Sequence, residues 1–127
     1  MAPDVRPVLI VDDDVAVRRT IGRFLGFEGF TVVEVDNGLK ALTYLRGGGE
    51  AGVIVLDLRM PVMDGWTFRS EQRRDPALAG IPVIVLSGAD ADRFQELDAV
   101  AAFEKPFSMP QLVATVRRFC EVPPTAA

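Results

Sequence analysis

The chain has 127 residues, of which 49% are apolar, and its formal net charge is −4 at neutral pH. This length and apolar content suffice for one domain with its own core. The chain has no histidine and one cysteine, Cys120, which excludes a disulfide framework and removes the commonest general base and metal ligand. The acidic balance argues against a nucleic-acid surface, and no apolar run approaches the roughly 20 residues of a membrane span. We therefore expect a cytoplasmic protein without direct contact to nucleic acid or membrane, in which any metal has oxygen ligands.

Runs of apolar and β-branched residues alternate along the chain with segments in which apolar residues recur at helical spacing. In chain order, the runs predict strands over residues 8–11, 31–35, 53–57, 81–86 and 100–103. The helical spacing predicts helices over residues 17–25, 37–46, 66–74, 90–97 and 108–120. Asp14 is placed to cap the first helix, Gly26 and Gly29 to end it, and Asp64 to form a turn before the third. We expect the chain to divide into a leader, one domain and a flexible tail, over residues 1–7, 8–120 and 121–127.

This alternation sets the class of fold. Strands that are apolar on both faces need helices on both faces, and each strand–helix–strand unit makes a right-handed crossover that pairs its strands in parallel. The sequence therefore predicts an α/β fold with a doubly wound, open sheet of five parallel strands. In such sheets, ligands bind at the carboxyl ends of the strands.

Four of the five predicted strands end at polar side chains. Those side chains are Asp12, Asp13, Asp57, Ser87 and Lys105. Converging carboxylates repel one another, and a hard divalent cation such as Mg²⁺ relieves that repulsion. Magnesium on carboxylates commonly shares its shell with a phosphoryl group, whose far side a lysine and a hydroxyl can bind. Asp57 stands alone at a central strand end and is the best candidate for attack on phosphorus.

The motifs around these residues resemble a response-regulator receiver domain of two-component signalling, of the single-domain chemotaxis type. The resemblance extends from Val8 to Phe119. It rests on four motifs, which are Asp12-Asp13, the stretch Leu56–Gly65 around Asp57, Ser87-Gly88-Ala89 and Lys105-Pro106-Phe107. The resemblance implies the flavodoxin-like strand order 2-1-3-4-5 with five helices.

The resemblance also implies a role for each site residue. Asp57 would accept a phosphoryl group from the phosphohistidine of a sensor histidine kinase or histidine phosphotransferase. Mg²⁺ would be held by the side chains of Asp12, Asp13 and Asp57 and by the backbone carbonyl of Arg59. Ser87 and Lys105 would bind phosphoryl oxygens, Arg59 and Ala89 would tune the phosphoryl lifetime, and the peptide between Lys105 and Pro106 would be cis. The protein would then be no enzyme apart from self-phosphorylation from a phosphodonor and autodephosphorylation.

Two features depart from the usual receiver pattern. Lys105 follows Ser87 by only 18 positions, and the glycine that commonly precedes the fifth strand is missing, so we expect a shortened fourth helix. The usual switch aromatic lies three residues before the lysine, where this chain has Ala102. Strand alternation puts the next residue, Phe103, on the opposite face. Either the switch aromatic is absent, or Phe103 takes its role through a local shift of the strand.

We predict a stand-alone receiver that signals to a downstream protein target by protein–protein contact or by phosphorelay. Arg18, Arg19 and Arg23 predict a solvated face of the first helix, beside which the kinases or phosphotransferases of this family often dock. The alternative is a receiver-like interaction module that acts independently of phosphorylation, which the short fourth helix and Ala102 suggest. A Mg²⁺-dependent hydrolase of outside substrates is disfavoured, because no second general base stands out.

Overall fold

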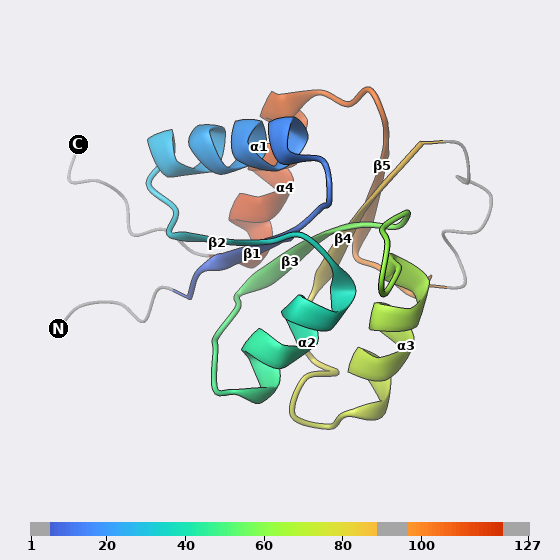
Figure 1. Ribbon diagram of the computed structural model, residues 1–127. Coiled ribbons are helices and arrows are strands. Elements are labelled where there is room, and N and C mark those ends of the chain that lie inside the picture. The colour runs from blue at the N-terminus through green and yellow to red at the C-terminus, as the bar shows by residue number, and fades with distance from the viewer. Residues whose placement is uncertain (1–5, 89–96, 121–127) are drawn as a thin grey trace, which may run out of the picture.

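The computed structural model describes residues 6–88 and 97–120 (Figure 1). Its strands are β1 (Val8–Val11), β2 (Val32–Val35), β3 (Val53–Asp57), β4 (Val83–Ser87) and β5 (Ala101–Glu104). Its helices are α1 (Val15–Phe27), α2 (Gly38–Arg46), α3 (Gly65–Arg74) and α4 (Met109–Phe119). The shortened helix expected over residues 90–97 lies, apart from Leu97, outside the described residues, as do most of the expected leader and all of the expected tail.

The five strands form one parallel sheet in the order β2-β1-β3-β4-β5. The predicted doubly wound fold and its strand order are therefore confirmed. Strands β1, β3 and β4 are buried along their whole length, because α1 and α4 cover one face of the sheet and α2 and α3 cover the other (Figure 1).

Alternate residues of each central strand enter two separate cores, as the pleat of a strand requires. Leu9 of β1 packs in the core with α2 and α3, whereas Ile10 packs in the core with α1 and α4. The continuous apolar runs of the sequence therefore reflect burial from both sides. No helix within the described ranges is both long enough and apolar enough to cross a membrane.

Every described helix begins directly after a polar cap at the carboxyl edge of the sheet. The side chains of Asp14, Asn37, Asp64 and Ser108 each accept a hydrogen bond from a backbone N–H in the first turn of the helix that follows. The predicted cap at Asp14 is thus confirmed, and Asp64 caps α3. Gly26 was expected to end the first helix and lies inside it, since α1 continues to Phe27.

A buried arginine ties α3 to the chain just ahead of β5. Arg69 is 6% exposed, and its guanidinium donates to the carbonyls of Leu97 at 2.8 Å and Asp98 at 2.9 Å, and to Oε1 of Gln72 at 2.8 Å. Asp98 has a φ of 50°, a left-handed conformation in which glycine is the usual residue. Arg69 thus holds the turn for which the sequence lacks the expected glycine.

We expect Arg69→Ala to lower the free energy of unfolding by about 2–4 kcal/mol, because two carbonyls and Gln72 lose their donor in a buried place. The matched control on the same helix is Arg74, whose side chain is 78% exposed and pairs with Glu71 at the surface. Arg74→Ala should change the free energy by no more than about 0.5 kcal/mol. Urea denaturation measures both variants, and equal losses would contradict the role of the Arg69 contacts.

Candidate functional site

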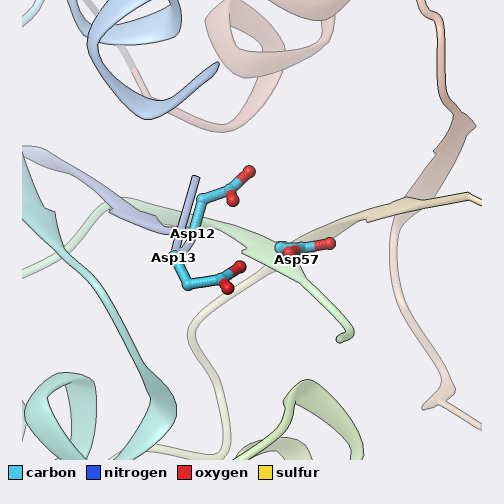
Figure 2. Close-up of side chains that lie close together, drawn as sticks. All are labelled: Asp12, Asp13 and Asp57. Carbon is cyan, nitrogen blue, oxygen red and sulfur yellow. The ribbon is translucent and has the colours of Figure 1, made fainter. Parts of the chain in front are cut away.

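Three carboxylates meet at the carboxyl edge of the sheet. Asp12 and Asp13 follow β1, and Asp57 ends β3, which pairs with β1. Figure 2 shows the three side chains together, and one carboxylate oxygen of each lies within 4.8 Å of those of the other two. Asp12 and Asp57 are 0% and 6% exposed, whereas Asp13 is exposed. The structure thus brings the predicted carboxylates into one group that is open to solvent on the side of Asp13.

Lys105 reaches the same edge from the end of β5. Its Nζ lies 3.3 Å from Oδ1 of Asp57 and 3.5 Å from Oδ2 of Asp12. Its backbone N–H donates to the carbonyl of Ser87 at 2.7 Å, which joins the ends of β4 and β5, and Ser87 itself is buried. The peptide between Lys105 and Pro106 is cis, as the resemblance implied.

The charges in this group are out of balance. Burial, with repulsion from Asp12 second, raises the pKa of Asp57 to about 6 from its ordinary 3.8, although Lys105 works in the opposite direction. Burial likewise raises the pKa of Asp12. Although burial opposes its charge, the pKa of Lys105 is raised, because the two carboxylates stabilise the ammonium group. A single ammonium therefore does not compensate two buried carboxylates, and a further cation would be favoured.

The carboxylate group fits a small divalent cation. Mg²⁺ binds oxygen ligands at about 2.0–2.1 Å, so opposite oxygens in its shell lie roughly 4.2 Å apart. The oxygens of Asp12, Asp13 and Asp57 already lie within 4.8 Å of one another, so small side-chain movements bring them to that spacing. The exposure of Asp13 leaves a side of the group accessible to water and to an incoming ligand.

The β3–α3 connection folds tightly against Asp57. The N–H of Gly65 donates to the carbonyl of Leu58 at 2.8 Å, and a Cβ at Gly65 would lie 2.5 Å from the carbonyl oxygen of Asp57. Only glycine therefore allows α3 to begin this close to the site. Val62 is 77% exposed with a φ of 70°, which is a strained conformation for a β-branched residue. Arg59 lies in this connection, two residues after Asp57, with an exposed side chain.

Ala102 and Phe103, the two candidates for the switch position, lie on opposite faces of β5. Ala102 is exposed, whereas Phe103 is half-buried and packs in the core with α1 and α4, 6.5 Å from Phe107 between ring centroids. The pairing of β5 with β4 is regular from Ala101 to Glu104, so the strand contains no shift that carries Phe103 to the face of Ala102. Ala89 lies outside the described residues.

One expectation about the first helix is wrong. Arg19 and Arg23 are exposed, as predicted for a solvated face, but the side chain of Arg18 is only 14% exposed and pairs with Glu34. The position of Arg18 in the sequence could have indicated this burial. Arg18 lies seven residues, or about two helical turns, before the buried Leu25 and therefore on the same side of the helix. The predicted solvated face thus contains two of the three arginines, and the side chain of Arg18 is half-buried.

The strand order 2-1-3-4-5 defines a flavodoxin-like domain. Its topological switch point lies between β1 and β3, because the chain leaves these two neighbouring strands in opposite directions across the sheet. The group of Asp12, Asp13 and Asp57 lies at this switch point. Within that class, the chain belongs to the response regulator receiver domain family, whose profile matches residues 8–117.

Known proteins similar to this chain include kinases and response regulators. The chain is 40% identical over 119 residues to the sensor kinase CckA of Brucella abortus (strain 2308). The matched region covers 90% of this chain but only 12% of the length of that kinase. It resembles the signal receiver domain of a signal transduction histidine kinase from Syntrophus aciditrophicus, with a TM-score of 0.84, 29% identity and coverage of 90% and 89% of the two chains. It also resembles the chemotaxis response regulator CheY4 of Vibrio cholerae, with a TM-score of 0.79, 26% identity and coverage of 91% and 98%.

We expect Asp57→Asn to raise the free energy of unfolding at neutral pH by about 1–3 kcal/mol, because the raised pKa of Asp57 means that the fold disfavours its ionised form. The folded protein keeps the proton of Asp57 up to about pH 6, whereas the unfolded chain releases it near 3.8. Wild-type stability from this group therefore falls as the pH rises between these values, and the advantage of the variant appears over the same range.

Urea denaturation without divalent cations, at neutral pH and below the ordinary pKa of aspartate, measures this difference. Below that pKa, Asp57 is protonated in both states of the wild type, so the two proteins should be equally stable. A variant that is less stable than the wild type at neutral pH would show that the ion pair with Lys105 outweighs burial and repulsion.

Proposed function

We propose that this chain accepts a phosphoryl group on Asp57 from the phosphohistidine of a sensor histidine kinase or histidine phosphotransferase, with Mg²⁺ as the cofactor. The observation that carries the proposal is the grouping of Asp57 with two further carboxylates and Lys105 at the carboxyl edge of the sheet. Membership of the receiver family supports it, as does a relative that is named as a sensor kinase. In this proposal the protein is cytoplasmic and signals by protein–protein contact or by phosphorelay.

Each residue has a distinct task in the proposed transfer. A carboxylate oxygen of Asp57 forms a bond to phosphorus while the bond from phosphorus to the donor imidazole breaks and the imidazole leaves with the electron pair. Mg²⁺, when held by Asp12, Asp13, Asp57 and the carbonyl of Arg59, would neutralise the carboxylates and the phosphoryl oxygens.

Lys105 and Ser87 would bind the transferred group from the other side. The ammonium of Lys105 already lies 3.3 Å from Oδ1 of Asp57, so a short movement takes it to a phosphoryl oxygen bonded next to that position. Ser87 ends the neighbouring strand, and its hydroxyl is a donor of the kind that a second phosphoryl oxygen needs. Neither residue requires a rearrangement of the sheet for this task.

A groove beside the site supports docking of the donor along α1. It has a volume of about 550 Å³, and its lining includes Val17, Thr20, Lys105, Pro106 and Phe107. The lining is largely apolar and ends at Lys105, while α1 carries the exposed Arg19 and Arg23. A donor helix with apolar and acidic side chains would therefore fit beside the phosphoryl acceptor.

Incubation with a small phosphodonor such as acetyl phosphate, followed by intact-mass spectrometry, tests the proposal. We expect the wild type to gain the mass of one phosphoryl group when Mg²⁺ is present, and to gain none after chelation. Asp57→Asn should gain none because the nucleophile is missing. The matched control is Asp75→Asn, which makes the same chemical change at the carboxyl end of α3 and should be labelled like the wild type.

Two results would contradict this assignment. Equal labelling of the wild type and Asp57→Asn would place the phosphoryl group elsewhere. A wild-type chain that binds Mg²⁺ and stays unlabelled would favour the alternative interaction module, which acts independently of phosphorylation and agrees with the exposed Ala102 at the usual switch position.

A further inference from the structure

Arg18 connects three elements around the end of β1. Its Nη1 donates to the backbone carbonyl of Asp12 at 2.9 Å, and its Nε donates to Oε1 of Glu34 at 3.2 Å. The side chain begins on α1, whereas Glu34 lies on β2 next to β1. This guanidinium therefore contacts the main chain of a site residue without entering the carboxylate group itself.

The bond to Asp12 fixes the peptide that joins the two acidic residues. The carbonyl of Asp12 and the Cα of Asp13 lie in the same peptide plane, so the orientation of that carbonyl sets where Asp13 leaves the strand. The N–H of Asp12 donates to the carbonyl of Val35 at 3.2 Å, and its Oδ1 accepts from the N–H of Asp14 at 2.9 Å. Arg18 supplies the contact that fixes the carbonyl side of the same residue.

Glu34 holds the guanidinium in this position, and Gly22 leaves the space for Glu34. A Cβ at Gly22, one turn further along α1, would lie 2.9 Å from Oε2 of Glu34. Glycine within a helix costs about 1 kcal/mol relative to alanine. The helix thus carries a destabilising residue at the place where a side chain would displace the carboxylate that binds Arg18.

An arginine is suited to this place because its donors form a rigid fork. The guanidinium donates at the same time to the backbone carbonyl of Asp12, just after β1, and to the carboxylate of Glu34 on β2, with a geometry that a single ammonium group does not reproduce. Lysine could satisfy either acceptor but leaves the other without its donor. The identity of the residue therefore matters as well as its charge.

We propose that Arg18 is a positioning residue of the acidic site, and that its guanidinium orients the Asp12–Asp13 peptide so that both carboxylates face one divalent cation. The inference rests on the proposed function, because this orientation has a use only if the carboxylates bind the cation. Groups that orient metal ligands without touching the metal typically change metal affinity by about tenfold or more when removed.

Titration of the full chain with Mg²⁺ alone, followed by the amide resonances of Asp13 and Asp57, tests the proposal. Arg18→Met keeps the aliphatic stem and should weaken Mg²⁺ affinity about tenfold, and the carbonyl ¹³C resonance of Asp12 should shift in the metal-free protein because its donor is lost. Arg18→Lys should recover part of the affinity. The control is Arg19→Met at the exposed neighbouring position, which should match the wild type.

A merely structural role predicts a different result. In that case Arg18→Met would lower the free energy of unfolding, measured in urea, while the folded variant bound Mg²⁺ as tightly as the wild type. That outcome would overturn the positioning role and leave the proposed phosphoryl acceptance standing, provided that the wild type is labelled by the phosphodonor. A wild type whose resonances do not respond to Mg²⁺ would overturn both.

Gly22→Ala provides an independent test that removes no donor or acceptor. Helix propensity favours alanine by about 1 kcal/mol, so the variant should fold, while its methyl group displaces the carboxylate of Glu34. We expect weaker Mg²⁺ binding in the same direction as for Arg18→Met, with a smaller loss, and the same for Glu34→Gln. If Arg18→Met does not fold, wild-type affinity in both of these variants would overturn the proposal.

Discussion

The repulsion between buried carboxylates at the ends of β1 and β3 is the constraint on which the rest of the structure depends. The parallel register pairs Val11 with Leu56, so the residues that follow, Asp12 and Asp57, must be neighbours wherever these strands pair. The raised pKa of Asp57, about 6, shows that the fold opposes its charge. The apolar cores on both faces of the sheet therefore hold these strand ends together against the repulsion between their carboxylates.

Local patterns in the sequence predicted the strands and helices that bring the site together, because apolar runs indicate buried strands and capping residues indicate where helices begin. Arg18, Arg69 and Gln72 escaped these patterns. Arg18 binds Glu34, 16 residues away, and Arg69 binds Leu97, 28 residues away. Helical spacing indicates which side of a helix faces the protein, but a long side chain can either extend to solvent or bind a distant acceptor. Only the tertiary structure decides between these outcomes, and the strand order itself came from family resemblance.

The connection between the site and the rest of the molecule differs from the family pattern at β5. Ala102 offers no aromatic ring, and Phe103 packs on the opposite face with α1 and α4. Both ends of β5 are nevertheless tied to β3 or to the helix that follows it, α3. Lys105 contacts Asp57 at the carboxyl end, and Arg69 holds the chain ahead of the amino end. A change at Asp57 that moves Lys105 therefore acts on a strand whose other end is anchored to α3.

The half-buried Arg18 and the buried Arg69 meet the same physical need at different places. Each guanidinium binds backbone carbonyls where the chain leaves regular pairing, at the end of β1 for Arg18 and ahead of β5 for Arg69. A carbonyl without a donor in such a place costs free energy and leaves its peptide free to rotate. Carboxylates that repel one another would move apart if the peptides that carry them could rotate. The main chain next to them is therefore fixed by contacts outside the charged group. In the proposed role of Arg18, part of the rigidity of the acidic site is thus supplied by a side chain that the phosphoryl transfer itself does not use.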